Sequence, residues 1–90
     1  MFERAQEVVN EFGKSGQKLT NEQALELYAY FKQATVGNVN TQRPGMFDLS
    51  GKAKWDAWKL KEGISQLQAR EAYVSTARNV LPHEWVVRIA

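Results

Sequence analysis

The first apolar stripe of the chain lies within about residues 2 to 13. Apolar side chains recur there at spacings of three and four, which is the period of a helix with one buried face. The positions of this stripe are Phe2, Ala5, Val9 and Phe12. The opposite side carries glutamates, and Gly13 and Gly16 then interrupt the pattern. We therefore predict a first amphipathic helix.

A second helix is predicted from about residue 20 to residue 36. Thr20, followed three residues later by Gln23, forms a capping-box pattern in which the first turn satisfies its own backbone hydrogen bonds. Gly37 is a suitable C-terminal stop. The side chains expected to face the interior are Ala24, Leu25, Tyr28, Phe31 and Ala34.

Residues 37 to 50 are predicted to form a long connection rich in Gly, Asn and Thr. Arg43-Pro44-Gly45 is a turn signal, because proline fixes φ and glycine accepts a positive φ. Connections of this length are often functional or are packed by their own side chains. We expect three apolar side chains to pin this one to the protein, namely Met46, Phe47 and Leu49.

Two more helices are predicted after the connection. Ser50 is the expected N-cap of a helix over residues 51–61, which carries Trp55 and Trp58 three positions apart. Ser65 is expected to cap a fourth helix that extends to about residue 80, where Pro82 prevents continuation. The expected inward stripe of the fourth helix is Ala69, Ala72, Tyr73, Thr76 and Val80. With no alternating strand pattern, the fold class is all-α, with four helices.

Composition adds limits to this picture. Ninety residues give one domain with one core, and three tryptophans favour a compact fold. There are no cysteines, which excludes disulfides and thiolate metal sites and fits a reducing compartment. No apolar run resembles a signal peptide or a membrane span, so we expect a soluble, cytoplasmic protein.

The charges are balanced overall but unevenly distributed. The formal net charge is only +2, whereas a nucleic-acid binder of this size usually has a stronger and more clustered basic excess. The first third is rich in glutamate, and lysines gather after residue 50. This asymmetry suits one local anionic ligand better than a nucleic acid.

The sequence gives little support for a catalytic site or a metal site. His83 is the only histidine, and it lies in the C-terminal segment, where we expect it to be exposed. Asp48 and Asp56 could pair as general acid and base, but surface or capping roles are the simpler interpretation. No metal-ligand spacing or glycine-rich phosphate loop is present, so we expect no enzyme, no metal and no cofactor.

Tyr28, Phe31 and Lys32 share one surface of the second helix, because they stand three and four positions apart. They could stack a purine and hold a phosphate. Spacing alone favours a simpler interpretation, with two core aromatics and a lysine that extends to solvent. Lys54 and Tyr73 are equally ambiguous when each is taken alone.

The segment from residue 32 to residue 59 reads KQATVGNVNTQRPGMFDLSGKAKWDAWK. It closely resembles the signature of the acyl-CoA-binding protein family, and the resemblance extends from Phe2 through Tyr73. It implies an up-down-down-up bundle with a long connection between the second and third helices. It also implies a monomer that binds one medium- to long-chain fatty acyl-CoA ester, catalyses no reaction and serves acyl-CoA-using enzymes and membranes transiently.

The resemblance implies roles for individual residues. Tyr28, Lys32 and Lys54 match positions that meet the nucleotide and its 3′-phosphate. Further matches to ligand-lining positions are Phe2, Phe31 and Tyr73, and those expected to touch the acyl chain are Leu25 and Ala53. The chain departs from the usual pattern at Phe31, a tyrosine in most members, and at Asn10 and Ser50, which replace lysines. Ser50 remains a possible ligand contact.

Residues 82–90 are unlike the usual family ending. Trp85, Val86, Val87 and Ile89 make this tail apolar, so it could pack as an extra segment or form a partner surface. We treat residues 1–90 as a single acyl-CoA-binding domain with a divergent tail. The alternative function is a protein-interaction module on the same fold.

Overall fold

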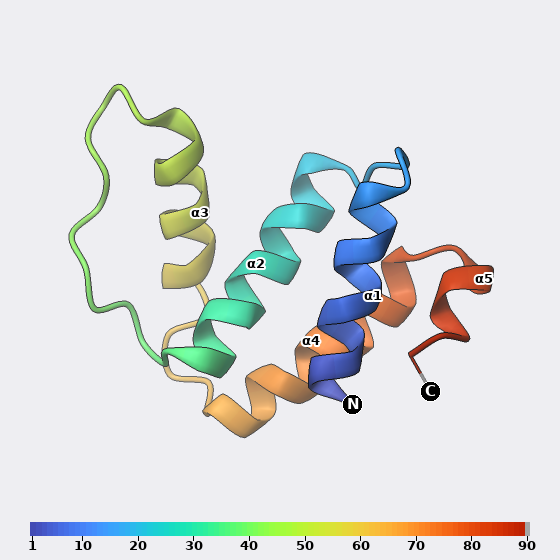
Figure 1. Ribbon diagram of the computed structural model, residues 1–90. Helices are drawn as coiled ribbons and strands as arrows, with labels where there is room; N and C mark the ends of the chain where they lie inside the picture. The colour runs from blue at the N-terminus through green and yellow to red at the C-terminus, as the bar shows by residue number, and fades with distance from the viewer. Residues whose placement is uncertain (90) are drawn as a thin grey trace.

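Each of the four segments with helical periodicity forms a helix, and a short fifth helix follows Pro82. The computed structural model describes residues 1–89. Its helices are α1 (Phe2–Lys14), α2 (Asn21–Thr35), α3 (Leu49–Lys59), α4 (Gln66–Val80) and α5 (His83–Val86). Figure 1 shows α1 and α4 running one way while α2 and α3 run the other, so the predicted up-down-down-up arrangement is confirmed.

The helices are unequally packed. α2 contacts both α3 and α4, and α1 packs against α4 and α5. Within residues 1–89, α3 packs against α2 alone (Figure 1). α3 therefore stands apart from the main core, and a face of α2 is left without a helical neighbour.

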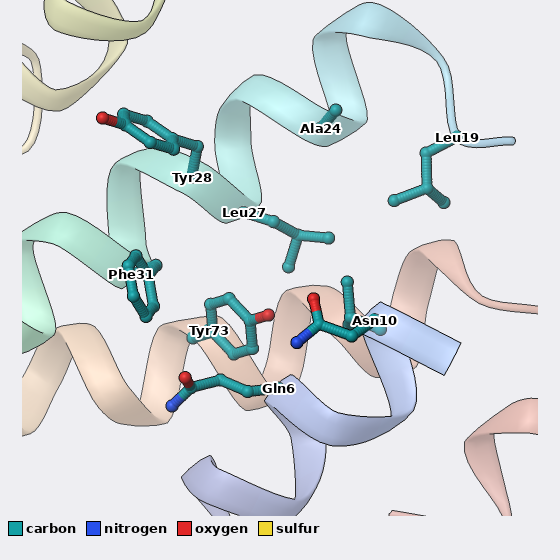
Figure 2. Close-up of a pocket in the computed structure, with 9 residues that line it drawn as sticks. Gln6, Asn10, Leu19, Ala24, Leu27, Tyr28, Phe31 and Tyr73 are labelled. Carbon is teal, nitrogen blue, oxygen red and sulfur yellow. The ribbon is translucent and has the colours of Figure 1, made fainter. Parts of the chain in front are cut away.

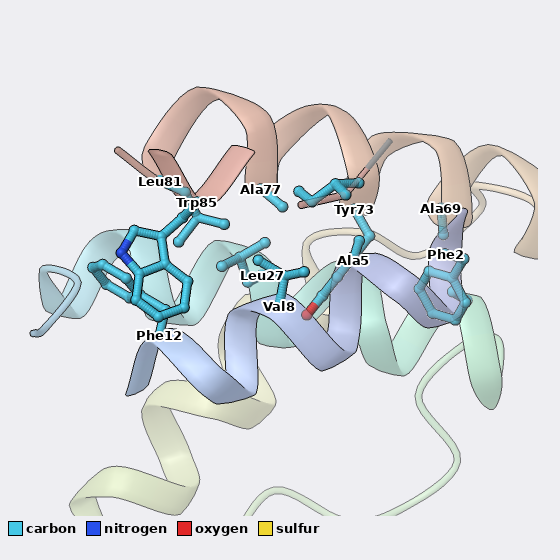
Figure 3. Close-up of a cluster of buried hydrophobic side chains, with 12 residues drawn as sticks. Phe2, Ala5, Val8, Phe12, Leu27, Ala69, Tyr73, Ala77, Leu81 and Trp85 are labelled. Atoms are coloured by element: carbon cyan, nitrogen blue, oxygen red, sulfur yellow. The ribbon is translucent and has the colours of Figure 1, made fainter. Parts of the chain in front are cut away.

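The hydrophobic core lies between α1, α2, α4 and the C-terminal segment (Figure 3). Four of its members are alanines, whose small side chains let the helix backbones approach closely. The buried cluster consists of Phe2, Ala5, Val8, Phe12, Leu27, Ala34, Ala69, Tyr73, Ala77, Leu81, Trp85 and Ile89. At about 0.8 kcal/mol per buried methylene, this cluster is the main source of stability.

The predicted interior of α1 needs one correction. Phe2, Ala5 and Phe12 are buried as expected, but Val8 is the fully buried valine and Val9 is half-buried. Both positions lie near the apolar stripe of a 3.6-residue helix, so periodicity could not separate them.

The predicted interior of α2 is largely wrong. The capping box of Thr20 and Gln23 is confirmed, but Ala24 is exposed. Tyr28 and Phe31 are only half-buried, and Leu27 is a core residue that was not expected, whereas Ala34 is buried as predicted. At 100° per residue, the predicted stripe is rotated by roughly a quarter turn from the core stripe. The predicted stripe lies on the side of α2 that the buried core does not cover.

The start of α3 differs from the prediction. The N-cap is Asp48, whose carboxylate accepts a hydrogen bond of 2.9 Å from the Gly51 N–H, and Ser50 lies inside the first turn. Asp48 and Ser50 are both good capping residues, so the local pattern allowed either. A Cβ on Gly51 would collide with the Asp48 carboxylate, which explains the glycine at this position.

The expected apolar pins of the connection are also wrong. Met46, Phe47 and Leu49 are 71%, 95% and 72% exposed. Polar contacts hold the connection instead, because its backbone carbonyls and its arginine meet side chains of α3. They link Trp55 Nε1 to the Thr41 carbonyl (3.1 Å), Trp58 Nε1 to the Gly37 carbonyl (2.8 Å), and Arg43 to both oxygens of Asp56 (2.8 Å each).

A buried amide of α2 ties the start of the connection to the segment that follows α3. Gln33, the one buried polar residue in the described part of the core, donates from Nε2 to Asn38 Oδ1 (2.9 Å) and to the Ile64 carbonyl (2.8 Å). Asn38 Oδ1 also accepts from the Gly63 N–H at 3.0 Å. Much of the motif that carries the family resemblance therefore builds the loop that positions α3.

α4 begins and ends as predicted. Ser65 caps it, and Leu81 turns to an extended conformation before Pro82. Ala69 and Tyr73 are buried, and Ala77 is a core residue that the predicted stripe missed.

The C-terminal segment packs against the bundle. The Trp85 ring meets Phe12 edge-to-face at 5.5 Å, and Ile89 is buried. Arg4 Nε donates to the Arg88 carbonyl at 2.8 Å. Of the two predicted possibilities, this favours an extra packed segment over a free partner surface. None of the helices within residues 1–89 is long and apolar enough to span a membrane.

Candidate functional site

Two neighbouring cavities lie along the face of α2 that the core leaves uncovered. The first, of about 290 Å³, lies between α1, α2 and α4, and we call it the inner pocket. The second, of about 410 Å³, lies between α2 and α3, and we call it the outer groove. Ala24 and Tyr28 line both cavities. The two cavities therefore adjoin each other at Ala24 and Tyr28.

The inner pocket combines aromatic rings with amides (Figure 2). Tyr28 and Phe31 enter it from α2 and Tyr73 from α4, while Gln6 and Asn10 supply amides from α1. Flat rings with nearby hydrogen-bonding amides suit a planar heterocycle such as a purine. The remaining lining residues are Val9, Leu19, Ala24 and Leu27.

Tyr73 is positioned by its packing in the core. Its ring meets Phe2 edge-to-face at 5.3 Å, and Figure 2 shows its hydroxyl directed into the inner pocket, toward Asn10. Burial raises the pKa of Tyr73 to about 12 because the phenolate would lose its solvation. Tyr73 therefore stays neutral at physiological pH and can both donate and accept a hydrogen bond.

The outer groove has an apolar floor and a polar rim. Leu25 of α2 faces Leu49 and Ala53 of α3, and the polar lining comes from Asn21, Ser50 and Lys54. Lys54 Nζ lies 5.4 Å from the centre of the Tyr28 ring. A positive charge thus stands where the two cavities meet.

Lys32 lies beside this site but lines neither cavity. Its Nζ lies 4.9 Å from the centre of the Trp58 ring. Among the ion pairs within the described residues, none involves Lys32 or Lys54. Two ammonium groups near Tyr28 and Trp58 therefore keep their charge available for an anionic ligand.

The structure brings most of the residues expected to bind ligand into these two cavities. Those in the inner pocket are Tyr28, Phe31 and Tyr73, and those in the outer groove are Leu25, Ser50, Ala53 and Lys54. Phe2 lines neither cavity, since it is buried behind Tyr73. The interpretation as core residues is wrong for Tyr28, which is half-buried and lines both cavities, and holds in part for Phe31, which packs against the core and also lines the inner pocket.

Several lining residues were missed by sequence reasoning. Gln6, Leu19, Asn21 and Ala24 belong to the walls but were not expected there. Gln6 stands four residues before Asn10, between the apolar stripe and the glutamates of α1, and this spacing was a signal for a shared polar edge.

The residues considered for catalysis are placed elsewhere. His83 is exposed at the start of α5, Asp48 caps α3, and Asp56 is paired with Arg43. The Arg43 hydrogen bond holds the pKa of the Asp56 carboxyl below its usual value. In the part of the chain that the structure describes, no group of three or more His, Cys, Asp or Glu side chains could hold a metal ion.

Comparison with known proteins identifies relatives of this chain. The family model described as Acyl CoA binding protein matches residues 1–77. Acyl-CoA-binding protein homolog 3 of Caenorhabditis elegans is 42% identical over 80 residues, which cover 88% of this chain and 69% of that protein. The acyl-CoA-binding protein of Ricinus communis is 53% identical over 62 residues, or 69% of each chain.

Solved structures give the same result for the fold. The crystal structure of an acyl-CoA-binding protein from Moniliophthora perniciosa superposes with a TM-score of 0.82 at 43% identity, covering 98% of this chain and 88% of that one. Acyl-CoA-binding protein 2 of Oryza sativa gives a TM-score of 0.67 at 42% identity, covering 84% and 89%.

Proposed function

This chain belongs to the acyl-CoA-binding protein family, and from that premise we propose that it binds medium- to long-chain fatty acyl-CoA esters non-covalently. In this proposal residues 1–90 act as a single ligand-binding domain and a monomer. The protein serves as a cytoplasmic acyl-CoA carrier and pool former, exchanging its ligand transiently with enzymes and membranes. The observation that carries the proposal is the pair of cavities of different chemistry that meet at Tyr28.

The inner pocket suits the nucleotide end of the ligand. An adenine would stack on the rings of Tyr28 and Phe31 and hydrogen-bond with the amides of Gln6 and Asn10. The replacement of the usual family tyrosine by Phe31 keeps a stacking surface and removes one hydroxyl. Asn10 in place of a lysine leaves an uncharged hydrogen-bonding group in the pocket wall.

Lys54 and Lys32 would hold the 3′-phosphate. They come from different helices, and each ammonium lies beside an aromatic ring: Lys54 beside Tyr28, which lines both cavities, and Lys32 beside Trp58, outside them. A phosphate dianion is attracted more strongly by such cations where the surroundings are partly desolvated. The cation–ring contacts are worth about 0.5–1 kcal/mol at exposed sites, so a phosphate can draw both ammonium groups away from their rings.

The outer groove suits the acyl chain. Leu25, Leu49 and Ala53 give it an apolar lining. Each methylene buried there contributes about 0.8 kcal/mol, so two more methylenes strengthen binding by roughly tenfold while the groove has room. Nanomolar binding needs about 12 kcal/mol, and the proposal divides this between the two ends of the ligand.

The test is calorimetric titration of the protein with palmitoyl-CoA, free CoA and palmitate. We expect palmitoyl-CoA to bind at least a hundredfold more tightly than either fragment, which corresponds to about 2.7 kcal/mol. Equal affinity for CoA and palmitoyl-CoA would contradict the proposal. Release of free thiol from palmitoyl-CoA would instead point to an acyl-CoA-processing enzyme.

The alternative function is a protein-interaction module that would use the apolar tail as its contact surface. The apolar tail was its expected site of contact, but Trp85 and Ile89 are buried against the bundle. Because the tail packs into the core, the two cavities support a function better than the tail does.

A further inference from the structure

An apolar projection stands where the long connection enters α3. We call Met46, Phe47 and Leu49 the apolar tip. These side chains are among the most exposed large hydrophobic groups in the chain, and Phe47 is almost fully exposed at 95%. Gathered within four consecutive residues, they form a local patch rather than scattered surface residues, and such patches mark interaction sites.

The apolar tip borders the outer groove. Leu49 belongs to the tip and also lines the groove beside Ser50 and Ala53. In Figure 1 the connection arches outside α3 and rejoins it at the end away from α4. The tip thus lies at the mouth of the cavity that is proposed to hold the acyl chain.

The charges beside the apolar tip are mainly positive. Lys52 and Lys54 follow it on α3, and neither takes part in an ion pair among the described residues. Asp48 lies within the tip, but its carboxylate accepts from the Gly51 N–H and faces the positive end of the α3 dipole. The surface next to the exposed apolar groups therefore attracts anions.

We propose that the apolar tip inserts into anionic bilayers while Lys52 and Lys54 rest against the lipid headgroups. The inference deepens the proposed carrier function and rests on it. Exposed apolar side chains next to basic ones match the two contributions that hold peripheral proteins on anionic membranes. Three projecting side chains are too few for a stable protein interface, which takes about 800 Å² from each partner.

Docking in this orientation places the mouth of the outer groove at the membrane surface. An acyl chain leaving the bilayer would then reach Leu49 and Leu25 without crossing water, and its CoA headgroup would meet Lys54 at the rim. The same contact would deliver a chain in the opposite direction. Met46 and Phe47, which line neither cavity, would thus speed ligand exchange without altering the affinity of the protein for its ligand in solution.

The first experiment measures the partition of the ligand-free protein onto phosphatidylcholine vesicles with and without phosphatidylserine. Phe47→Ser tests the apolar tip, and Leu60→Ser is the matched control because Leu60 is 82% exposed beyond the other end of α3. We expect wild type to prefer the anionic vesicles and Phe47→Ser to weaken that partition by about tenfold. Leu60→Ser should match wild type.

Two outcomes would overturn the inference. One is failure of the wild-type protein to bind anionic vesicles, and the other is equal partition of Phe47→Ser and wild type. Calorimetric titration in solution separates membrane insertion from the carrier function, because Phe47→Ser should bind palmitoyl-CoA with unchanged affinity. If wild type binds no palmitoyl-CoA, the carrier proposal fails by itself, whatever the vesicles show.

Transfer kinetics test the functional consequence. The rate at which a fluorescent acyl-CoA moves from anionic vesicles to the wild-type protein should rise with vesicle concentration, as expected for transfer on contact. Phe47→Ser should lower that rate severalfold, and Leu60→Ser should not. Identical rates in all three proteins would contradict a loading role for the apolar tip.

Discussion

Tyr28 illustrates how one residue can serve two binding environments. Tyr28 lines both the inner pocket and the outer groove, and Lys54 Nζ lies 5.4 Å from the centre of its ring. Tyr28 therefore lies where a region suited to a stacked base adjoins one suited to a hydrocarbon chain. A positive charge at this boundary is close to both.

At the residue scale, we predict that Lys32→Ala and Lys54→Ala each weaken palmitoyl-CoA binding by an order of magnitude or more. Each substitution removes one of the two ammonium groups proposed to hold the phosphate, and charge-assisted hydrogen bonds are worth about 1.5–3 kcal/mol. Calorimetric titration gives the dissociation constants, and circular dichroism checks that both variants remain folded.

Lys59→Ala is the control for these variants. Lys59 is an exposed lysine at the end of α3, and its Nζ pairs with Glu62 at 2.9 Å. Its loss should leave binding within about twofold of wild type, because exposed ion pairs contribute little. If neither Lys32→Ala nor Lys54→Ala changes the dissociation constant, the proposed phosphate contact is wrong.

At the element scale, α3 depends on its connection for its position. It packs against α2 alone within residues 1–89, and Trp58 is its one buried side chain. Trp55 and Trp58 donate hydrogen bonds to carbonyls of the connection, and Asp56 accepts from Arg43, so the connection helps to hold α3 at its distance from α2. That distance sets the width of the outer groove.

We predict that Asp56→Asn loosens the connection without unfolding the core. The variant loses the two-pronged contact with Arg43, so hydrogen exchange should accelerate in residues 38–48 and hardly change in α1 and α4. The control is Glu62→Gln, which removes the carboxylate that pairs with Lys59 instead. Unchanged exchange in the connection would show that the tryptophan hydrogen bonds suffice.

The same ion pair gives a pH dependence of known sign. The pKa of Asp56 is lowered in the folded protein, so the contact is fully present above the ordinary carboxyl value of 3.8. It is lost as the pH falls through the lower folded pKa. In wild type, the protection of residues 38–48 against hydrogen exchange, relative to an unfolded chain at the same pH, should therefore fall only below about pH 4.

The C-terminal segment forms part of the core. We predict that Trp85→Ala lowers the free energy of unfolding by about 3–5 kcal/mol, because it empties a site that packs against Phe12. Chemical denaturation measures this loss. Val87→Ala is the control, since Val87 is exposed and should change stability by less than about 0.5 kcal/mol. Equal stability of both variants would contradict a structural tail.

At the scale of the whole molecule, the site lies between the buried core and α3, a helix that packs against α2 alone within residues 1–89. α1, α2, α4 and the C-terminal segment share the buried cluster, and α3 adds the outer wall of the groove. A ligand that bridges α2 and α3 would join the two parts. Binding should therefore stabilise α3 more than the rest of the fold.

We predict that palmitoyl-CoA at a hundredfold excess over its dissociation constant raises the free energy of unfolding by about 2.7 kcal/mol. For a chain of this length, that corresponds to a melting temperature higher by roughly 10–20 °C. Differential scanning calorimetry with and without ligand measures the change, and free CoA at the same concentration as palmitoyl-CoA is the control. Equal shifts with CoA and palmitoyl-CoA would indicate that the acyl chain contributes nothing.

The sequence by itself determined the four main helices and part of the lining of the two cavities. Thr20 and Ser65 mark helix starts because they satisfy N–H groups within three residues, and Pro82 ends α4 because it cannot donate a hydrogen bond. These are local effects that a short segment contains entirely. Resemblance to the family then identified Tyr28, Lys54 and Tyr73, which the structure places in the walls of the two cavities.

Only the tertiary structure decided which apolar side chains are buried. α2 is apolar on several sides, so its periodicity could not distinguish Leu27, which packs in the core, from Tyr28, which faces a cavity. Likewise, Phe47 was predicted to pack against the protein, but polar contacts hold the connection and Phe47 is exposed. Trp85 could have been exposed as far as its sequence shows, but it is buried. Burial depends on which elements meet, and those contacts join residues far apart in the chain.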